Sequence, residues 1–121
     1  GGVFKTNTKR LKKGEIWWVN FNPAKGSEQS VRRPAVIVSG NLLNTYAPDL
    51  YVCPITTKIK NYKGDVIVEP DSQSGIAETS EVLIMHLRSI SKNRLESKIG
   101  DLSPAQLQEL RTGIQDLLLL D

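Results

Sequence analysis

Short apolar runs separated by turn residues dominate the first two thirds of the chain. The runs are rich in β-branched and aromatic side chains, and no segment of crossover-helix length lies between them. This pattern predicts strands at residues 15–21, 35–39, 50–56, 65–68 and 81–84. Short strands with regular breaks favour a small antiparallel barrel over a doubly wound sheet. Residues 41–46 are expected to form a short helix or turn, and residues 91–95 a brief helix.

The C-terminal residues carry the clearest helix signal. Ser103 is a natural N-cap, Pro104 takes the first helical position, and Gln106 completes a capping-box spacing. Leu102 and Leu107 have the spacing of a hydrophobic staple. We therefore expect a helix that begins after Ser103.

One face of this helix is apolar and is expected to pack on the sheet. Its positions recur at helical spacing: Leu107, Leu110, Ile114 and Leu117. Residues 118–120 are all leucine and widen the stripe, so this end could reach a second subunit. Gly113 lies in the middle, where glycine costs up to about 1 kcal/mol relative to alanine.

A polar segment, residues 26–34 with the sequence GSEQSVRRP, joins the first two predicted strands. It carries a carboxylate, an amide, hydroxyls and the adjacent guanidiniums of Arg32 and Arg33. Loops mounted on strands are where binding and catalytic groups concentrate, and paired arginines offer fixed donors suited to phosphate. A solvated hairpin loop with incidental charge is the alternative.

The net charge of +3 conceals an uneven distribution. Through residue 63 there are eleven Lys or Arg against three Asp or Glu, and from residue 64 onward there are five against ten. The basic part favours a polyanionic partner, and the acidic part is typical of a solvated surface. Residues 1–12 are expected to be a flexible basic tail, and residues 13–121 a single domain.

The single cysteine and the lack of long apolar segments bear on the compartment. Cys53 excludes an intrachain disulfide and suits a reducing cytosol, and its apolar surroundings in the sequence predict a buried, inert thiol. No run approaches the roughly 18 apolar residues that span a bilayer, and the N-terminus lacks a signal-peptide core. We therefore expect a cytoplasmic protein without membrane contact.

Several classes of chemistry lack the residues they need. One histidine and one cysteine cannot build a structural zinc site, and the chain has no EF-hand, Walker or dinucleotide-binding glycine motif. A serine–histidine–aspartate triad could form only through His86, with no nucleophile-elbow spacing to support it. We therefore expect neither a metal nor a cofactor.

The remaining polar residues can support phosphate chemistry. Arg33 precedes a proline, which favours an extended backbone at the start of the second strand. Thr56 and Thr57 end the third strand, and Lys58 and Lys60 follow them. If these strand ends are neighbours, a guanidinium, hydroxyls and ammonium groups converge on one phosphodiester.

Metal-free RNA cleavage makes three demands on such a site. The ribose 2′-hydroxyl must be oriented for attack on its own phosphorus, charge on the phosphoryl oxygens must be stabilised, and two protons must move. Arg33 suits the charge stabilisation, but an ordinary guanidinium is too basic to donate a proton readily. Glu28 is a plausible base.

Structural roles remain open for these residues. Two threonines are ordinary strand composition, a lone histidine in a strand, as His86 is expected to be, is more often structural than catalytic, and Arg88 could be an ion-pair partner. Trp17 and Trp18 point to opposite faces of a strand. One is expected in the core, and the other to cover a neighbour or contact a base.

The order of short motifs resembles that of a known family. The first half carries GEIW at residues 14–17, GSEQ at 26–29, RRPAVIVS at 32–39 and CPITT at 53–57. The second half carries LRSI at 87–90 and KNRL at 92–95, before the terminal helix. From about residue 13 to residue 120, in this order and spacing, the chain is similar to the MazF/PemK toxins.

The resemblance implies an SH3-like antiparallel β-barrel with appended helices, usually assembled as a homodimer. It also implies the toxin of a type II toxin–antitoxin system, a sequence-specific, metal-independent endoribonuclease that cleaves single-stranded mRNA. Its products would carry 2′,3′-cyclic phosphate and 5′-hydroxyl ends. A labile cognate antitoxin would wrap the dimer and block its RNA groove.

The family's catalytic arginine and threonine fall on Arg33 and Thr56. Substrate contacts are expected at Ser27, Glu28, Gln29, Arg32, Thr57, Lys58 and His86, of which the first three are the family's loop positions. Many relatives have glutamine where this chain has His86, so His86 is expected to contact substrate rather than to be an indispensable base. Whether Glu28, His86 or neither is the general base stays open.

Two other functions fit parts of the sequence. A gyrase poison of the CcdB kind shares the fold but inserts a C-terminal tail that usually contains tryptophan, and residues 117–121 have no aromatic side chain. A non-catalytic RNA- or protein-binding barrel needs only the basic surface. Its binding would weaken steeply with salt, without strand scission.

Overall fold

The structure, a computed structural model, describes residues 10–21 and 31–119. Its strands are β1 (Glu15–Asn20), β2 (Arg32–Ile37), β3 (Asp49–Thr56), β4 (Val66–Val68), β5 (Ser80–Val82), β6 (Arg88–Ser91) and β7 (Leu95–Asp101). Its helices are α1 (Asn41–Tyr46) and α2 (Pro104–Leu117), with the 3-10 helices η1 (Ile84–His86) and η2 (Lys92–Arg94). None of the helices in these residues has the length and apolar character needed to cross a membrane.

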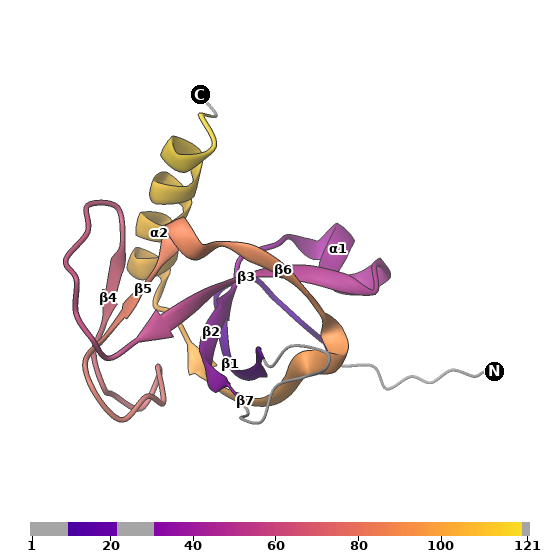
Figure 1. Ribbon diagram of the computed structural model, residues 1–121, viewed down its shortest axis with the longest axis horizontal. Helices are drawn as coiled ribbons and strands as arrows, with labels where there is room; N and C mark the ends of the chain where they lie inside the picture. Colours follow the sequence, from indigo (N-terminus) through magenta and orange to yellow (C-terminus); the bar gives the residue numbers. More distant parts are fainter. Residues whose placement is uncertain (1–9, 22–30, 120–121) are drawn as a thin grey trace.

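The strands form one antiparallel sheet in the order β4-β5-β3-β2-β1-β7. β3 has two partners along one edge, because residues 49–52 pair with β6 while residues 55 and 56 pair with β5. The sheet curls into an SH3-like half-barrel. In Figure 1, β1, β2, β3, β6 and β7 surround a common centre, with β4, β5 and α2 to one side. The expected antiparallel β-fold with a C-terminal helix is confirmed.

Both faces of the sheet are covered at β1 and β3, which explains why these two strands are apolar runs rather than strictly alternating. Successive residues of β1 go to different clusters, with Trp17 and Val19 inside the curl and Ile16 on the other face. The inner cluster consists of Leu11, Trp17, Val19, Ala35, Ile37, Leu50, Val52, Ile90 and Leu95. Leu11 thus packs in the core at the end of the predicted tail, whereas residues 1–9 lie outside the described residues.

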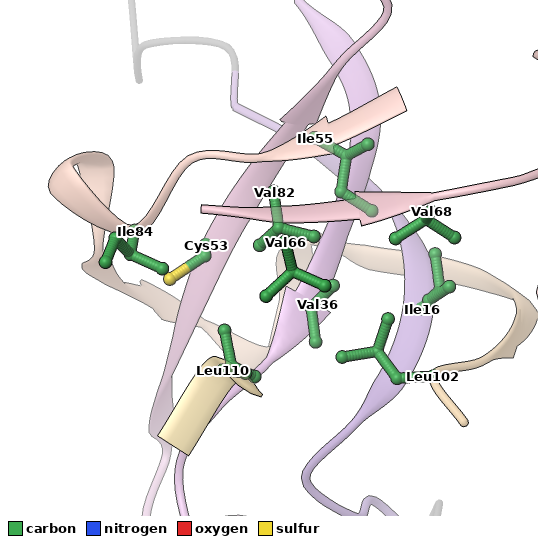
Figure 2. Close-up of a cluster of buried hydrophobic side chains, with 10 residues drawn as sticks. All are labelled: Ile16, Val36, Cys53, Ile55, Val66, Val68, Val82, Ile84, Leu102 and Leu110. Atoms are coloured by element: carbon green, nitrogen blue, oxygen red, sulfur yellow. The ribbon is translucent and has the colours of Figure 1, made fainter. Parts of the chain in front are cut away.

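The outer cluster joins the sheet to β4, β5 and α2. Figure 2 shows Leu110 of α2 meeting side chains from the sheet and from β4 and β5, with Cys53 and Ile84 at one side of the cluster. The members are Ile16, Val36, Cys53, Ile55, Val66, Val68, Val82, Ile84, Leu102 and Leu110. Cys53 is fully buried, and burial together with the nearby charge of Asp65 raises the pKa of its thiol to about 12. The expected buried, unreactive thiol is confirmed.

The tryptophan pair divides as predicted. Trp17 is buried in the inner cluster and its indole nitrogen donates to Glu15 Oε1 at 2.9 Å. Trp18 is half-buried on the opposite face, where the guanidinium of Arg32 lies 4.8 Å from its ring centroid. Trp18 therefore covers a neighbouring side chain.

The start of α2 matches the sequence prediction in detail. Ser103 Oγ accepts from the backbone of Gln106 at 3.1 Å, and Gln106 Oε1 accepts from the backbone of Ser103 at 2.8 Å. Leu107, Leu110 and Ile114 pack against the outer cluster. Leu117 was expected in the same stripe but is exposed, as are Leu118 and Leu119, because α2 extends past the sheet. Leu120 lies outside the described residues.

Gly113 has a packing role that helix propensity does not reveal. A Cβ at this position would lie 2.6 Å from the backbone oxygen of Gly64 and 2.9 Å from Ile84 Cδ1. Only a residue without a side chain lets α2 approach Gly64 and Ile84 this closely. The glycine brings the helix against the segment before β4 and against η1.

The structure departs from the sequence prediction at four strands. β2 begins at Arg32, so the two arginines belong to the strand rather than to the polar segment before it. β6 and β7 were not predicted, because their sequences RSIS and LESKIGD each hold only one fully buried residue and are mostly polar. β5 ends at Val82, and Ile84 begins η1, where its backbone nitrogen donates to Asp65 Oδ1 at 3.1 Å.

Candidate functional site

A polar cleft of about 530 Å³ lies where the start of β2 meets the end of β3. β2 and β3 are antiparallel, with Ala35 opposite Pro54. Continuing this register by two residues brings Arg33 opposite Thr56 at the open end of the strand pair. The cleft is lined by Arg32, Arg33, Pro34, Ile55, Thr56, Thr57, Lys58, Lys60, Tyr62, Leu83 and His86. The two strand ends, which the sequence left open as possible neighbours, therefore meet at this cleft.

The two arginines of β2 have different surroundings. Arg32 Nε donates to Glu96 Oε1 at 2.6 Å, and its guanidinium stacks on Trp18. Arg33 is exposed, and no hydrogen bond or ion pair joins its guanidinium to another described residue. Adjacent strand residues point to opposite faces. Arg32 is therefore held against the barrel wall, while Arg33 is available to bind an anion.

Thr56 ends β3 with its side chain half-buried in the cleft. Its Oγ1 accepts from the backbone nitrogen of Lys58 at 3.0 Å, which turns the chain at this point. A hydroxyl that accepts in this way still has its proton to donate. Thr56 can therefore hydrogen-bond a ligand oxygen, and the turn directs Thr57 and Lys58 to the same opening.

The segment after Thr56 is held in place by the buried carboxylate of Glu81. Glu81 on β5 pairs with Thr56 across the sheet and is fully buried. Its Oε1 accepts from the backbone nitrogens of Lys60 at 2.6 Å and Asn61 at 2.8 Å, and its Oε2 from that of Tyr62 at 3.2 Å. Glu81 was not predicted as a site residue, although the position of its carboxylate between Ser80 and two apolar residues indicates burial.

Asp65 lies beside Glu81 and accepts from the backbone of Ile84 at the start of η1. Burial, and then the hydrogen bond with Glu81, raise the pKa of Asp65 to about 6. Burial alone would raise the pKa of Glu81, but its hydrogen bonds from Asp65 and the three backbone nitrogens lower it to about 2. With these pKa values the pair retains one proton between about pH 2 and pH 6, and Asp65 holds it.

His86 lies on η1 and not on a strand, which corrects the sequence prediction. The exposed imidazole lines the cleft and also a smaller hollow of about 230 Å³. The smaller hollow is lined by Phe21, Val31, Arg33, Pro54, His86 and Arg88. Arg88 there lies 5.3 Å from the ring centroid of Phe21. Arg33 and His86 thus line both hollows.

The charged side chains that line the cleft are all basic. Arg32, Arg33, Lys58 and Lys60 line it together with His86, and no carboxylate is among its described lining residues. An anion such as a phosphodiester is the ligand that such a surface favours. In the part of the chain that the structure describes, no three His, Cys, Asp or Glu side chains are grouped so that they could hold a metal ion.

Part of the predicted site cannot be placed. Ser27, Glu28 and Gln29 lie in residues 22–30, outside the described residues. The flanking residues are described, and the backbone nitrogen of Phe21 donates to the carbonyl of Val31 at 2.8 Å. Both flanking residues line the smaller hollow, so residues 22–30 join the described chain beside the site.

Comparison with known proteins gives a consistent result. Residues 12–118 match the family described as PemK-like, MazF-like toxin of type II toxin–antitoxin system. Over 105 residues the chain is 31% identical to the endoribonuclease MazF of Staphylococcus saprophyticus, covering 86% of this chain and 88% of the relative. It is 32% identical over 105 residues to the endoribonuclease toxin MazF of Escherichia coli K12, covering 87% and 91%.

Solved structures share the fold. A MazE–MazF complex from Deinococcus radiodurans contains a chain that superposes with a TM-score of 0.78 at 28% identity, covering 94% of this chain and all of that one. A MazF structure from the same organism superposes with a TM-score of 0.71 at 30% identity, covering 89% and 96%.

Proposed function

This chain belongs to the PemK-like, MazF-like toxin family of type II toxin–antitoxin systems, and we propose that it is an endoribonuclease that cuts single-stranded mRNA at specific sequences without a metal ion. The curated relatives at 31% and 32% identity are named endoribonucleases. The observation that carries the proposal is the cleft in which Arg33, Thr56, Lys58 and Lys60 surround one opening.

In the proposed reaction the ribose 2′-hydroxyl attacks its own phosphorus. The new bond joins the 2′-oxygen to phosphorus, and the bond to the 5′-oxygen breaks, which leaves a 2′,3′-cyclic phosphate and a 5′-hydroxyl. The 2′-hydroxyl loses a proton to a base, and the departing 5′-oxygen gains a proton from an acid. Negative charge accumulates on the phosphoryl oxygens between these events.

We assign Arg33 to stabilising the negative charge on the phosphoryl oxygens. Its guanidinium is exposed in the cleft and pairs with no other described residue, so binding a phosphate breaks no ion pair within the described part of the chain. Thr56 donates its hydroxyl proton to a phosphoryl oxygen, and Lys58 and Lys60 add positive charge at the same opening. These four groups supply fixed donors that need little rearrangement as the charge develops.

His86 and the smaller hollow are assigned to substrate contacts. The hollow offers the half-buried aromatic ring of Phe21 and two guanidiniums, those of Arg33 and Arg88. Unstacked bases of single-stranded RNA bind to such combinations of stacking surface and donors. Arg33 and His86 line both hollows, so a base next to the scissile phosphate can enter the smaller one.

We further propose a cognate antitoxin and a second copy of this chain as partners, in the cytoplasm. A similar chain in Deinococcus radiodurans was solved as a MazE–MazF complex. At the end of α2, the exposed side chains of Leu117, Leu118 and Leu119 give an apolar surface suited to a protein contact. Ser27, Glu28 and Gln29 are proposed as further RNA contacts.

The first experiment incubates purified protein with a long single-stranded RNA in EDTA and maps the cut ends by primer extension. We expect discrete cuts at a repeated short motif, which Arg33→Ala abolishes while the protein stays folded. Arg111→Ala, an exposed arginine on α2, is the matched control and should cut normally. Intact RNA, with no antitoxin co-purified, or normal cutting by Arg33→Ala would contradict the proposal.

A further inference from the structure

A buried carboxylate connects β3 to the segment that follows it, and both line the cleft. Glu81 lies on β5, opposite Thr56 of β3, and accepts from three successive backbone nitrogens of the segment that carries Lys58, Lys60 and Tyr62. An ionised carboxylate is costly to bury unless its oxygens are satisfied. Three backbone donors meet that requirement and fix the path of the segment at the same time.

The backbone of this segment is shaped to receive an anion. Asn61 has a φ of 57°, in the left-handed region that non-glycine residues rarely adopt. Successive N–H groups that turn through such a residue form a concave anion site, or nest. Here the anion is the side chain of Glu81, so the conformation of the segment depends on that carboxylate.

Asp65 extends the connection to His86. Its Oδ1 accepts from Ile84, the first residue of η1, while its Oδ2 is buried and accepts from no described group. The carboxyl groups of Glu81 and Asp65 lie within reach of each other, and a hydrogen bond between them requires a proton on one of the two. Two carboxylates in contact repel each other, whereas a proton on Asp65 Oδ2 gives the buried oxygen a partner and removes the repulsion.

We propose that Glu81 and Asp65, sharing one proton, are positioning residues that hold the Lys58–Lys60 side of the cleft and η1 in one arrangement, so that loss of this proton loosens the site. The inference rests on the proposed function of the cleft. Neither carboxyl group lines the cleft, so both act through the backbone and not on RNA. The raised pKa of Asp65 is consistent with a proton held there.

Other titratable groups face Asp65 from the elements packed around it. Cys53 approaches from β3 with its thiol neutral, since its pKa is about 12. A separate hollow of about 420 Å³ brings further groups near the exposed side of Asp65, namely Tyr62, Lys63, Glu109 and Asp116. None of these groups is a hydrogen-bond partner of the Asp65 carboxyl group, whose titratable partner is Glu81.

The shared proton is tested on labelled protein by NMR, without RNA. In the wild type, the amide protons of Lys60, Asn61 and Tyr62 should shift together as the pH rises through about 6, the pKa of Asp65, and then exchange faster with solvent. Asp65→Asn carries a permanent N–H donor toward Glu81 and should abolish that shift. A wild-type titration that survives unchanged in Asp65→Asn would overturn the proposal.

The positioning role is tested by kinetics on the same variants. Glu81→Gln keeps the size of the side chain but loses the charge that the three nitrogens bind, and we expect kcat/KM to fall about tenfold, mostly through KM. Glu78→Gln, an exposed glutamate three residues earlier, is the matched control. A folded Glu81→Gln with the kcat and KM of the wild type would overturn the role.

The two experiments separate this inference from the proposed function. If the wild type leaves RNA intact, the endoribonuclease proposal fails, and the NMR titration still decides whether the pair holds the segment. If the wild type cuts RNA but the amides of Lys60, Asn61 and Tyr62 do not respond to Asp65→Asn, the cleft keeps its function and the positioning inference fails.

Discussion

Arg32 and Arg33 are adjacent in sequence, yet they have opposite surroundings. Both line the cleft, but Arg32 is engaged by Glu96 and Trp18, whereas Arg33 has no described partner. The chemistry of an arginine pair suggested a phosphate site but gave no order of importance. The family resemblance pointed to Arg33, and the alternation of side chains along β2 supplies a physical reason for the difference.

Thr56 allows a single-atom test of the proposed chemistry. Thr56→Val preserves the shape of the side chain but removes the hydroxyl, and we expect the cleavage rate to fall about 100-fold, the effect of losing one donor to a developing oxyanion. Thr56→Ser keeps the hydroxyl and should retain most of the rate. Single-turnover cleavage of a short RNA measures both variants.

The Thr56→Val substitution has two effects, and the cleavage experiment must separate them. Thr56 Oγ1 also accepts from Lys58, so Thr56→Val weakens the turn as well as the proposed contact with phosphate. Binding of an uncleavable 2′-deoxy analogue reports on the turn, because it depends on the position of Lys58. Equal cleavage by Thr56→Val and the wild type would exclude the assigned role.

At the level of elements, the contact between α2 and the segment before β4 leads us to predict that replacing a helical glycine by alanine lowers stability. Gly113→Ala improves helix propensity by about 1 kcal/mol. The new Cβ, however, would lie 2.6 Å from the backbone oxygen of Gly64. Overpacking of this kind costs about 1–3 kcal/mol, so we expect a lower melting temperature for Gly113→Ala than for the wild type.

Urea and thermal unfolding, followed by circular dichroism, measure that change. Gln115→Ala, at an exposed position of the same helix, is the control and should be neutral or slightly stabilising. If Gly113→Ala were the more stable variant, α2 would not pack against Gly64 as closely as described.

The elements that the sequence predicted well are those whose signal is local. The capping box of α2 lies within four residues, from Ser103 to Gln106, and β1 and β3 are continuous apolar runs because both faces of the sheet are covered. β7 is different. Its charged residues Glu96, Lys98 and Asp101 form ion pairs with side chains distant in sequence or along the strand, and its backbone pairs with β1. Such long-range partners leave no periodic pattern in the strand itself.

At the level of the whole molecule, the cleft gathers cations from segments about 25 residues apart in the sequence, near Arg33 and near Lys58. RNA binding should therefore weaken steeply with salt, and each phosphate contact adds about 0.7 to the slope of log K against log salt for single strands. We expect Lys58→Gln combined with Lys60→Gln to reduce this slope by about 1.4.

Fluorescence anisotropy with a 2′-deoxy oligonucleotide over a range of salt concentrations provides the measurement. Arg111→Gln removes one positive charge from α2, outside the cleft, and should leave the slope unchanged. Equal slopes for the double variant and the wild type would show that these lysines do not contact phosphate.

The site itself was only partly accessible to sequence reasoning. Arg33 and Thr56 follow from strand ends that antiparallel pairing brings together, which a reader of the sequence can anticipate. Glu81 acts through backbone nitrogens, and Asp65 through one more, so neither has a motif. Their role depends on the fold of β4 and β5 around the end of β3.

The pairing of β3 restricts how this protein can vary during evolution. One edge of β3 is paired with β2, and the other is divided between β6 and β5. Inserting or deleting a single residue within β3 would exchange its two faces, so that Cys53 and Ile55 would change clusters and Thr56 would leave Arg33. Divergence in β3 is therefore confined to substitutions, and changes in length must fall in the connecting segments.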